Sequence, residues 1–127
     1  MKTVLVVDDE KLIRWTLTQA LGPEYVVFTA ASVDEALDIL GRAPVDAVIT
    51  DLRMPGLDGF DLVERLRKLR PQVKIFALSA YATDEARRRL REQGVLECLA
   101  KPFELAEVLD VLRRHLGPSG HVGARSA

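Results

Sequence analysis

The sequence predicts an α/β protein with a doubly wound, five-stranded parallel sheet, and two patterns carry that prediction. Short apolar runs alternate with longer amphipathic stretches along the chain. The runs are rich in β-branched residues and too short for helices, whereas the longer stretches have apolar residues at helical spacing. Five strand–helix units in succession indicate a parallel sheet with right-handed crossovers and helices on both faces.

Five strands are expected, at residues 4–7, 25–29, 45–50, 73–78 and 95–100. The first run is apolar throughout, which is typical of a strand that is buried on both faces of its sheet. The other four are also rich in β-branched or aromatic residues, as strands usually are.

Between the strands, apolar residues recur on one face of a helix, which predicts amphipathic helices. Three such stripes are formed by Ile13, Leu17, Ala20 and Leu21, by Leu62, Val63, Leu66 and Leu69, and by Leu105, Val108, Leu109, Leu112 and Leu116. Two further helices are indicated by their first residues. Ser32 with Glu35 is a capping-box pattern, and Thr83 suits an N-cap.

Length and composition limit the classes to which the protein can belong. The 127 residues are 48% apolar, which suits one domain, expected at residues 1–116, followed by a flexible Gly- and Ser-containing tail at 117–127. The net charge of −1 gives no global attraction to nucleic acid or to a membrane surface. One cysteine cannot form an internal disulfide, and neither a signal peptide nor a membrane-spanning run is evident, so we expect a cytoplasmic protein.

Polar side chains follow four of the five predicted strands. They are Asp8, Asp9 and Glu10 after the first strand, Asp51 after the third, Ser79 after the fourth and Lys101 after the fifth. The carboxyl ends of parallel strands meet at one edge of a sheet, where ligands bind at the topological switch point. The second strand ends in Thr29, Ala30 and Ala31 and offers no such group, which suits an edge position and the strand order 2-1-3-4-5.

Each of these residues has an ordinary explanation when it is taken alone. Acidic residues often begin a helix, Asp51 precedes a Pro-Gly turn, and single serines and lysines are common on surfaces. Together, at one sheet edge, they indicate a site. Three crowded carboxylates repel one another and suit Mg²⁺, with Mn²⁺ as a second candidate. With cation and lysine offsetting the charge, Asp51 could attack a phosphoryl group, while Lys101 and Ser79 hold its oxygens.

Four motifs at these positions closely resemble the receiver domains of two-component response regulators. They are VVDDE at 6–10, TDLRMPGLDG at 50–59, SAY at 79–81 and AKPF at 100–103. The resemblance runs from about residue 2 to residue 116. It implies a flavodoxin-like fold, phosphotransfer from a histidine-kinase phosphohistidine to Asp51, and a cis bond before Pro102. It also implies metal ligation by Asp9, Asp51, the Arg53 backbone carbonyl and, directly or through water, Asp8.

Three positions are expected to modulate the switch. Receivers usually have Tyr or Phe three residues before the motif lysine, whereas this chain has Cys98. The substitution puts the usual aromatic signal in doubt but not the phosphorylation chemistry, and we expect a small buried thiol that packs as a hydrophobe rather than a redox group. Arg53 and Tyr81 lie two residues past the phospho-acceptor and two past the hydroxyl. They are expected to screen the acyl phosphate from water, unless both side chains point to solvent.

The resemblance implies a sensor histidine kinase or phosphotransfer protein as phosphodonor. It also implies a downstream protein that binds the face formed by the fourth helix, fifth strand and fifth helix. The arginines of the fourth helix, at 87, 88, 89 and 91, form either a solvated helix face or part of that surface. No direct binding to nucleic acid or membrane is expected.

Other functions fit the sequence less well. A Mg²⁺-dependent phosphohydrolase would need an acid two residues after its nucleophile, where this chain has Arg53, and no Gly-rich nucleotide loop follows the first strand. A binding module that does not use phosphate would normally have lost a site residue, and none is lost. We therefore expect a phospho-acceptor switch that is not an enzyme apart from catalysing its own phosphorylation and dephosphorylation.

Overall fold

The computed structural model describes residues 1–54, 57–80 and 82–117, so the predicted tail beyond residue 117 and Tyr81 lie outside the described residues. Its main sheet has five parallel strands in the order β2-β1-β3-β6-β7. In chain order these are β1 (Thr3–Val7), β2 (Val26–Ala30), β3 (Ala47–Asp51), β6 (Lys74–Ser79) and β7 (Val95–Ala100). The predicted order 2-1-3-4-5 is thereby confirmed.

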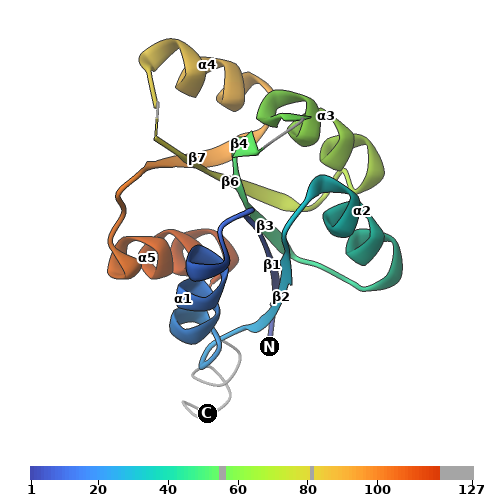
Figure 1. Ribbon diagram of the computed structural model, residues 1–127, viewed down its shortest axis with the longest axis vertical. Helices are drawn as coiled ribbons and strands as arrows, with labels where there is room; N and C mark the ends of the chain where they lie inside the picture. The colour runs from blue at the N-terminus through green and yellow to red at the C-terminus, as the bar shows by residue number, and fades with distance from the viewer. Residues whose placement is uncertain (55–56, 81, 118–127) are drawn as a thin grey trace.

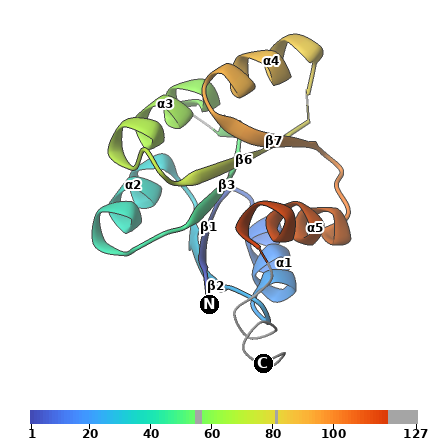
Figure 2. The ribbon, with the colours of Figure 1, turned by 180° about the vertical axis from the view of Figure 1, so that it is seen from behind.

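Five helices alternate with these strands. They are α1 (Lys11–Leu21), α2 (Val33–Arg42), α3 (Gly59–Leu69), α4 (Asp84–Glu92) and α5 (Leu105–Leu116). Figures 1 and 2 show α1 and α5 on one face of the sheet and α2, α3 and α4 on the other. The doubly wound α/β class is confirmed, and among the described residues no helix has the length and apolarity required to cross a bilayer.

Two apolar clusters hold the helices to the sheet. One joins α2, α3 and α4 to one face and includes Ala36, Leu66 and Leu90, and the other joins α1 and α5 to the opposite face and includes Leu17 and Leu112. All five side chains are at most 1% exposed. The strand β1 contributes Val4 and Val6 to one cluster and Leu5 and Val7 to the other, so it is buried on both faces as predicted.

Three predicted strands begin one or two residues before the observed ones. Tyr25, Val45 and Val73 precede the hydrogen-bonded strands, yet Tyr25 and Val73 are buried in the core. An apolar side chain can pack on the sheet before the backbone joins the ladder, so hydrophobicity alone sets the strand start too early. β2 lies at the edge of the sheet, as expected, and Val26 and Phe28 are partly exposed there.

Both predicted helix caps are confirmed. The Ser32 hydroxyl accepts a hydrogen bond from the Glu35 N–H at 3.2 Å, and the Thr83 hydroxyl accepts one from the Ala86 N–H at 3.1 Å. The Glu35 carboxylate reaches back to the Ala31 N–H at 3.3 Å. These bonds satisfy N–H groups that a helix start would otherwise leave unpaired, and they set the first turns of α2 and α4.

A short antiparallel hairpin after β3, formed by β4 (Arg53–Met54) and β5 (Leu57–Asp58), was not predicted. It ends at Gly59, whose N–H donates to the Leu52 carbonyl at 3.1 Å. A Cβ at Gly59 would lie 2.5 Å from that carbonyl oxygen and 2.6 Å from the Leu52 Cα. Glycine therefore permits α3 to start directly against the backbone that follows Asp51.

We expect Gly59→Ala to lower the free energy of unfolding by about 2 kcal/mol, because the added methyl group would collide with main-chain atoms that cannot rotate away. Urea unfolding followed by circular dichroism measures the change. Gly41→Ala, in α2, is the matched control, since nothing lies within 4 Å of its Cβ position. That variant should instead gain up to about 1 kcal/mol of helix propensity. Equal effects at the two glycines would contradict the close approach at Gly59.

Candidate functional site

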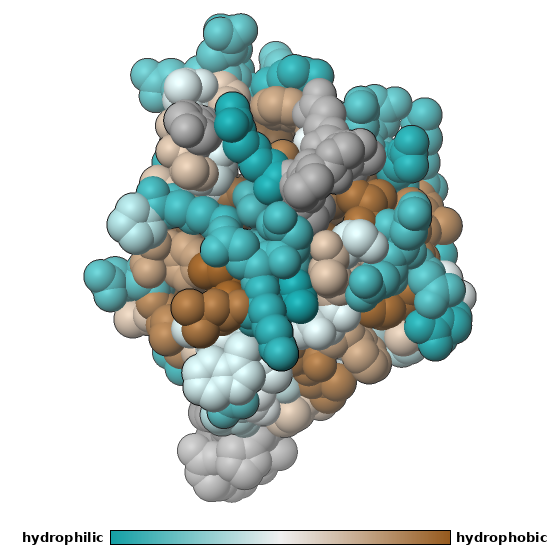
Figure 3. Space-filling view, viewed as in Figure 1, coloured by the Kyte–Doolittle hydropathy of each residue, from teal (hydrophilic) through white to brown (hydrophobic). Residues whose placement is uncertain are grey.

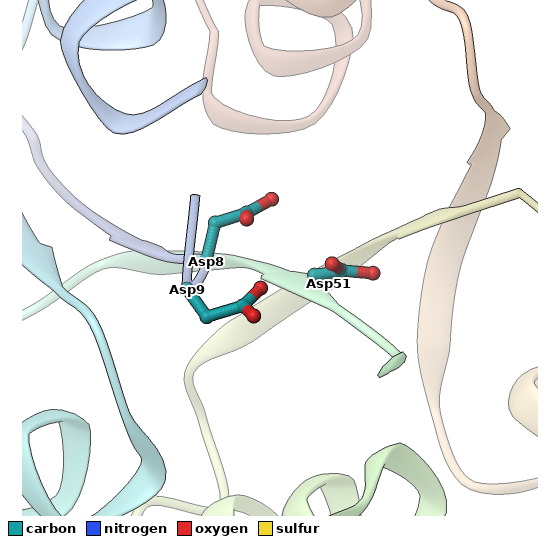
Figure 4. A group of neighbouring side chains, drawn as sticks. All are labelled: Asp8, Asp9 and Asp51. Carbon is teal, nitrogen blue, oxygen red and sulfur yellow. The ribbon is translucent and has the colours of Figure 1, made fainter. Parts of the chain in front are cut away.

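The ends of four strands bring the predicted site residues to one edge of the sheet. Asp8 and Asp9 follow β1, Asp51 ends β3, Ser79 ends β6 and Lys101 follows β7. Figure 4 shows the carboxylates of Asp8, Asp9 and Asp51 projecting from neighbouring strand ends toward a common space. One oxygen from each lies within 4.8 Å of the others. The cluster predicted from the strand ends is present.

Backbone hydrogen bonds orient the two buried carboxylates. Asp8 is fully buried and Asp51 is 5% exposed. The Glu10 N–H donates to Asp8 Oδ1 at 2.9 Å, and the Arg53 N–H donates to Asp51 Oδ1 at 3.1 Å. In each case the residue two positions further along the chain fixes one oxygen and leaves the second available to another group.

The second oxygen of each buried carboxylate faces Lys101. The Lys101 Nζ lies 3.1 Å from Asp51 Oδ2, 3.3 Å from Asp8 Oδ2 and 3.9 Å from a carboxylate oxygen of Glu10. Burial disfavours the ammonium form, but the carboxylates of Asp51 and Asp8 outweigh that effect and hold the pKa of Lys101 above its ordinary value. Lys101 is therefore a fixed positive charge between two buried aspartates.

Asp8 is held in an environment that resists its ionisation. Burial raises the pKa of the Asp8 carboxyl, and the neighbouring Asp51 charge raises it further. The Glu10 N–H and Lys101 act in the opposite direction, yet the pKa stays above its ordinary value. Burial is the largest cause of this shift, and the Lys101 ammonium does not outweigh it.

The donor set suits a hard divalent cation. Asp9 is exposed, and among the described residues its carboxylate has no hydrogen-bond or ion-pair partner. The exposed carboxylate of Asp9 and the two buried carboxylates would offer oxygen ligands on one side of a cation and leave its solvent-facing side open to water. Mg²⁺ and similar ions prefer this arrangement. A cation would supply the positive charge that Lys101 alone does not provide.

Ser79 is fixed relative to both Asp51 and Lys101 through the backbone of the sheet. Its side chain is buried at the end of β6, where Asp51 pairs with Leu78 in the neighbouring strand. The Lys101 N–H donates to the Ser79 carbonyl at 2.9 Å. The predicted cis bond between Lys101 and Pro102 is present. The hydroxyl, lysine and carboxylate therefore come from three adjacent strand ends.

Two of the predicted modulators lie within the described residues. Arg53 is exposed at the start of β4, directly after the cluster. Cys98 is half-buried in β7, and burial raises the pKa of its thiol although Arg87 lowers it slightly. Tyr81, the third, falls outside the described residues. Cys98 is thus a poorly ionised thiol away from the carboxylates.

One contact that supports the cluster was not predicted from the sequence. The Arg14 guanidinium donates to the Asp8 backbone carbonyl at 2.8 Å, which ties the first turn of α1 to the end of β1. Charged residues on a helix face are common, so the sequence position of Arg14 gave no signal.

Figure 3 shows the face of the molecule that is seen in Figure 1. Hydrophilic side chains run across the middle of that face, with apolar patches on both sides.

This fold, with an acidic cluster and a paired lysine at the switch edge of a parallel sheet, defines a phospho-acceptor domain. The family model of the response regulator receiver domain matches residues 4–113. The chain therefore belongs to the response regulator receiver domain family. Like other receivers of two-component signalling, it is not a conventional enzyme.

Similarity to individual proteins agrees with that assignment. The chain is 32% identical over 114 residues to sporulation initiation phosphotransferase F of Bacillus subtilis, a match covering 89% of this chain and 92% of the relative. It is 37% identical over 115 residues to the DNA-binding transcriptional regulator NtrC of Azospirillum brasilense, covering 90% of this chain but only 24% of that protein. The chain thus spans about a quarter of that longer relative.

A solved structure shares both the fold and the chemistry of the class. A response regulator protein from Burkholderia pseudomallei, crystallised with a phosphorylated aspartic acid, a calcium ion and citrate, superposes with a TM-score of 0.82 at 29% identity. The match covers 100% of this chain and 74% of that one. Phosphorylated aspartate thus occurs in a protein with the same fold and related sequence.

Proposed function

We propose that Asp51 is the phospho-acceptor of this receiver and that Mg²⁺ is the metal, with Mn²⁺ as a substitute. The observation that supports it best is the meeting of Asp8, Asp9 and Asp51 with Lys101 at one sheet edge. The metal ligands would be Asp9, Asp51, the Arg53 backbone carbonyl and, directly or through water, Asp8. A bound cation would neutralise phosphoryl and carboxylate charge, which lets two anions approach each other.

Asp51 is suited to nucleophilic attack because its two oxygens have different partners. Oδ1 is held by the Arg53 N–H at 3.1 Å, and Oδ2 lies 3.1 Å from Lys101. In the proposed reaction, a carboxylate oxygen forms a bond to phosphorus while the bond from phosphorus to the donor breaks. The donor keeps that electron pair, and with a phosphohistidine donor this regenerates the imidazole.

Lys101 and Ser79 would then bind the transferred group. Once Asp51 is esterified, its negative charge moves outward to the phosphoryl oxygens, and the Lys101 ammonium can pair with one of them. The Ser79 hydroxyl would donate to another. Arg53 and Tyr81 would slow hydrolysis because their side chains would screen the acyl phosphate from water. In addition, neither side chain would supply a general base to activate that water.

Receiver domains exchange phosphate with histidine kinases or phosphotransfer proteins, and we propose such a donor here. The proposed output is a downstream protein that binds the face formed by α4, β7 and α5, with Cys98 altering how that face responds. We do not propose that this domain binds nucleic acid or a membrane directly.

Intact-mass measurement after incubation with acetyl phosphate tests the assignment. The full chain should gain one phosphoryl group with Mg²⁺ and none in chelator. Asp51→Asn should gain none, whereas Asp61→Asn, at an exposed aspartate in the first turn of α3, should be labelled like the parent. Labelling of Asp51→Asn, or equal labelling in chelator, would refute the proposal.

A further inference from the structure

Arg87, in α4, bridges two backbone segments that lead to the site. The Arg87 Nη1 donates to the Cys98 carbonyl at 2.7 Å, and its Nε donates to the Ala82 carbonyl at 3.3 Å. Ala82 comes three residues after Ser79, and Cys98 comes three residues before Lys101. One half-buried guanidinium therefore connects the chain beyond the hydroxyl with the chain before the lysine.

At the site itself, the strands β6 and β7 are also joined directly. The Lys101 N–H donates to the Ser79 carbonyl at 2.9 Å, and Ser79 pairs with Ala100 in the register of β6 and β7. The Arg87 bridge and this backbone bond close a circuit through Ser79, Ala82, Cys98 and Lys101. A shift of the segment that carries Ser79 can therefore reach Arg87 and α4 through its contact with Ala82.

The small side chain at position 98 leaves space for this arrangement. A cleft of about 170 Å³ lies between α4 and β7 and is lined by residues that include Arg87, Leu90, Val95 and Cys98. Arg87 lines the cleft and reaches past the thiol to the β7 backbone. A guanidinium bound to a carbonyl is a charge-assisted hydrogen bond, which is stronger than a neutral one and geometrically specific.

The neighbouring arginines do not share this role. Arg88 is exposed and forms no hydrogen bond or ion pair with the part of the chain that the structure describes. Arg89 lies over the Phe60 ring of α3, with its guanidinium carbon 3.9 Å from the ring centroid. Of the consecutive arginines 87–89, only Arg87 donates hydrogen bonds to the described backbone at both Ala82 and Cys98.

We propose that Arg87 is a positioning residue that clasps α4 to β7 while Asp51 is unphosphorylated. It releases α4 when Ser79 moves to the phosphoryl group. The clasp thereby couples the site to the surface of α4, in a receiver whose usual aromatic side chain is replaced by Cys98. This coupling rests on the proposed function, whereas the clasp of the unphosphorylated protein does not.

Cys98 is a built-in reporter because it is the only cysteine in the chain and lines the same cleft as Arg87. We would measure the rate of Cys98 alkylation by iodoacetamide in the full chain, with and without acetyl phosphate and Mg²⁺, and follow phosphorylation by mass in the same samples. The variants are Arg87→Met, which keeps length but has no donor, Arg87→Lys, which can reach one carbonyl, and Arg88→Met as control.

Without phosphate, Arg87→Met should be alkylated at least about tenfold faster than the parent once each rate is divided by the thiolate fraction, because the variant also loses the guanidinium that lowers the thiol pKa. Tenfold corresponds to one lost charge-assisted hydrogen bond, and this variant loses two. Arg87→Lys should fall between the two, and Arg88→Met should match the parent. Phosphorylation should accelerate alkylation of the parent and of Arg88→Met but add nothing in Arg87→Met, because its clasp is already absent.

Parental alkylation rates for Arg87→Met in both states would overturn the proposal. An Arg87→Met protein that fails to fold leaves the decision to Arg87→Lys, whose alkylation at the parent rate would also overturn it. A parent that gains no phosphoryl group would refute the proposed function, and with it the coupling. The phosphate-free comparison of the parent with the Arg87 variants would still decide whether the clasp exists.

Discussion

Replacing Lys101 with methionine is expected to slow phosphorylation by about 100-fold or more and to destabilise the metal-free protein by about 3 kcal/mol. The ammonium lies 3.1 Å from Asp51 and 3.3 Å from Asp8, and both carboxylates are buried. Removing it leaves two buried carboxylates without the ammonium that they share. It also removes the cation that we propose binds a phosphoryl oxygen once the group has been transferred.

Urea unfolding in chelator and acetyl phosphate labelling measured by intact mass would test the two effects separately. Lys68→Met is the matched control, because Lys68 is exposed on α3 and pairs only with the exposed Glu64 among the described residues. It should change stability by less than about 0.5 kcal/mol. Mg²⁺ should recover part of the stability of Lys101→Met, since the cation replaces lost positive charge. Unchanged unfolding and labelling in Lys101→Met would contradict the role of the lysine.

The convergence of Asp8, Asp51 and Lys101 could be predicted from sequence because it follows from topology. In a parallel sheet all strands end at one edge, so recognising the strands was sufficient to bring distant residues together. The same rule gave the edge position of β2 from the absence of polar groups at its end. The distances and the burial could not be predicted, because they depend on how the side chains orient after the strands have paired.

The hairpin of β4 and β5 shows where periodicity stops being informative. Each strand has two residues, which is too short for an alternating pattern to be distinguished from a turn. The requirement for Gly59 was equally hidden, since it depends on an approach to the Leu52 backbone. Local sequence identified a turn after Asp51, whereas the start of α3 at Gly59 depends on a tertiary contact.

The arginines of α4 illustrate a second limit. From the sequence they could form either a solvated face or a binding surface. In the structure, three consecutive arginines have three different environments. Arg87 bonds to the backbone, Arg88 is exposed and Arg89 packs on Phe60. Successive helix residues point about 100° apart, so adjacent identical residues meet different surroundings. Which one faces β7 is decided by the docking of the helix.

Replacing Asp8 with asparagine is expected to stabilise the metal-free protein at neutral pH. Asparagine keeps an oxygen for the Glu10 N–H, while Lys101 retains Asp51 as a partner. The gain arises because the folded protein disfavours the ionised form of Asp8, whose pKa is raised by burial and then by Asp51.

The sign of the pH dependence follows from that direction. A carboxyl with a raised folded pKa contributes its stability fully below its ordinary value of 3.8, and that contribution is lost as pH rises through the folded pKa. The advantage of Asp8→Asn should therefore be absent in acid and grow with pH until Asp8 is ionised. Mg²⁺ should reverse the order, because the parent has one more carboxylate near the cation.

Urea unfolding across this pH range, in chelator and with Mg²⁺, measures both effects. Asp9→Asn is the control, because Asp9 is exposed and its carboxylate has no partner among the described residues. It should stabilise the metal-free protein less than Asp8→Asn does, because the Asp9 carboxylate is solvent-exposed, while weakening stabilisation by Mg²⁺. If Asp8→Asn is less stable than the parent at neutral pH in chelator, then Lys101 already compensates the cluster. The repulsion that we assign to three crowded carboxylates would then not be what makes this site bind a cation.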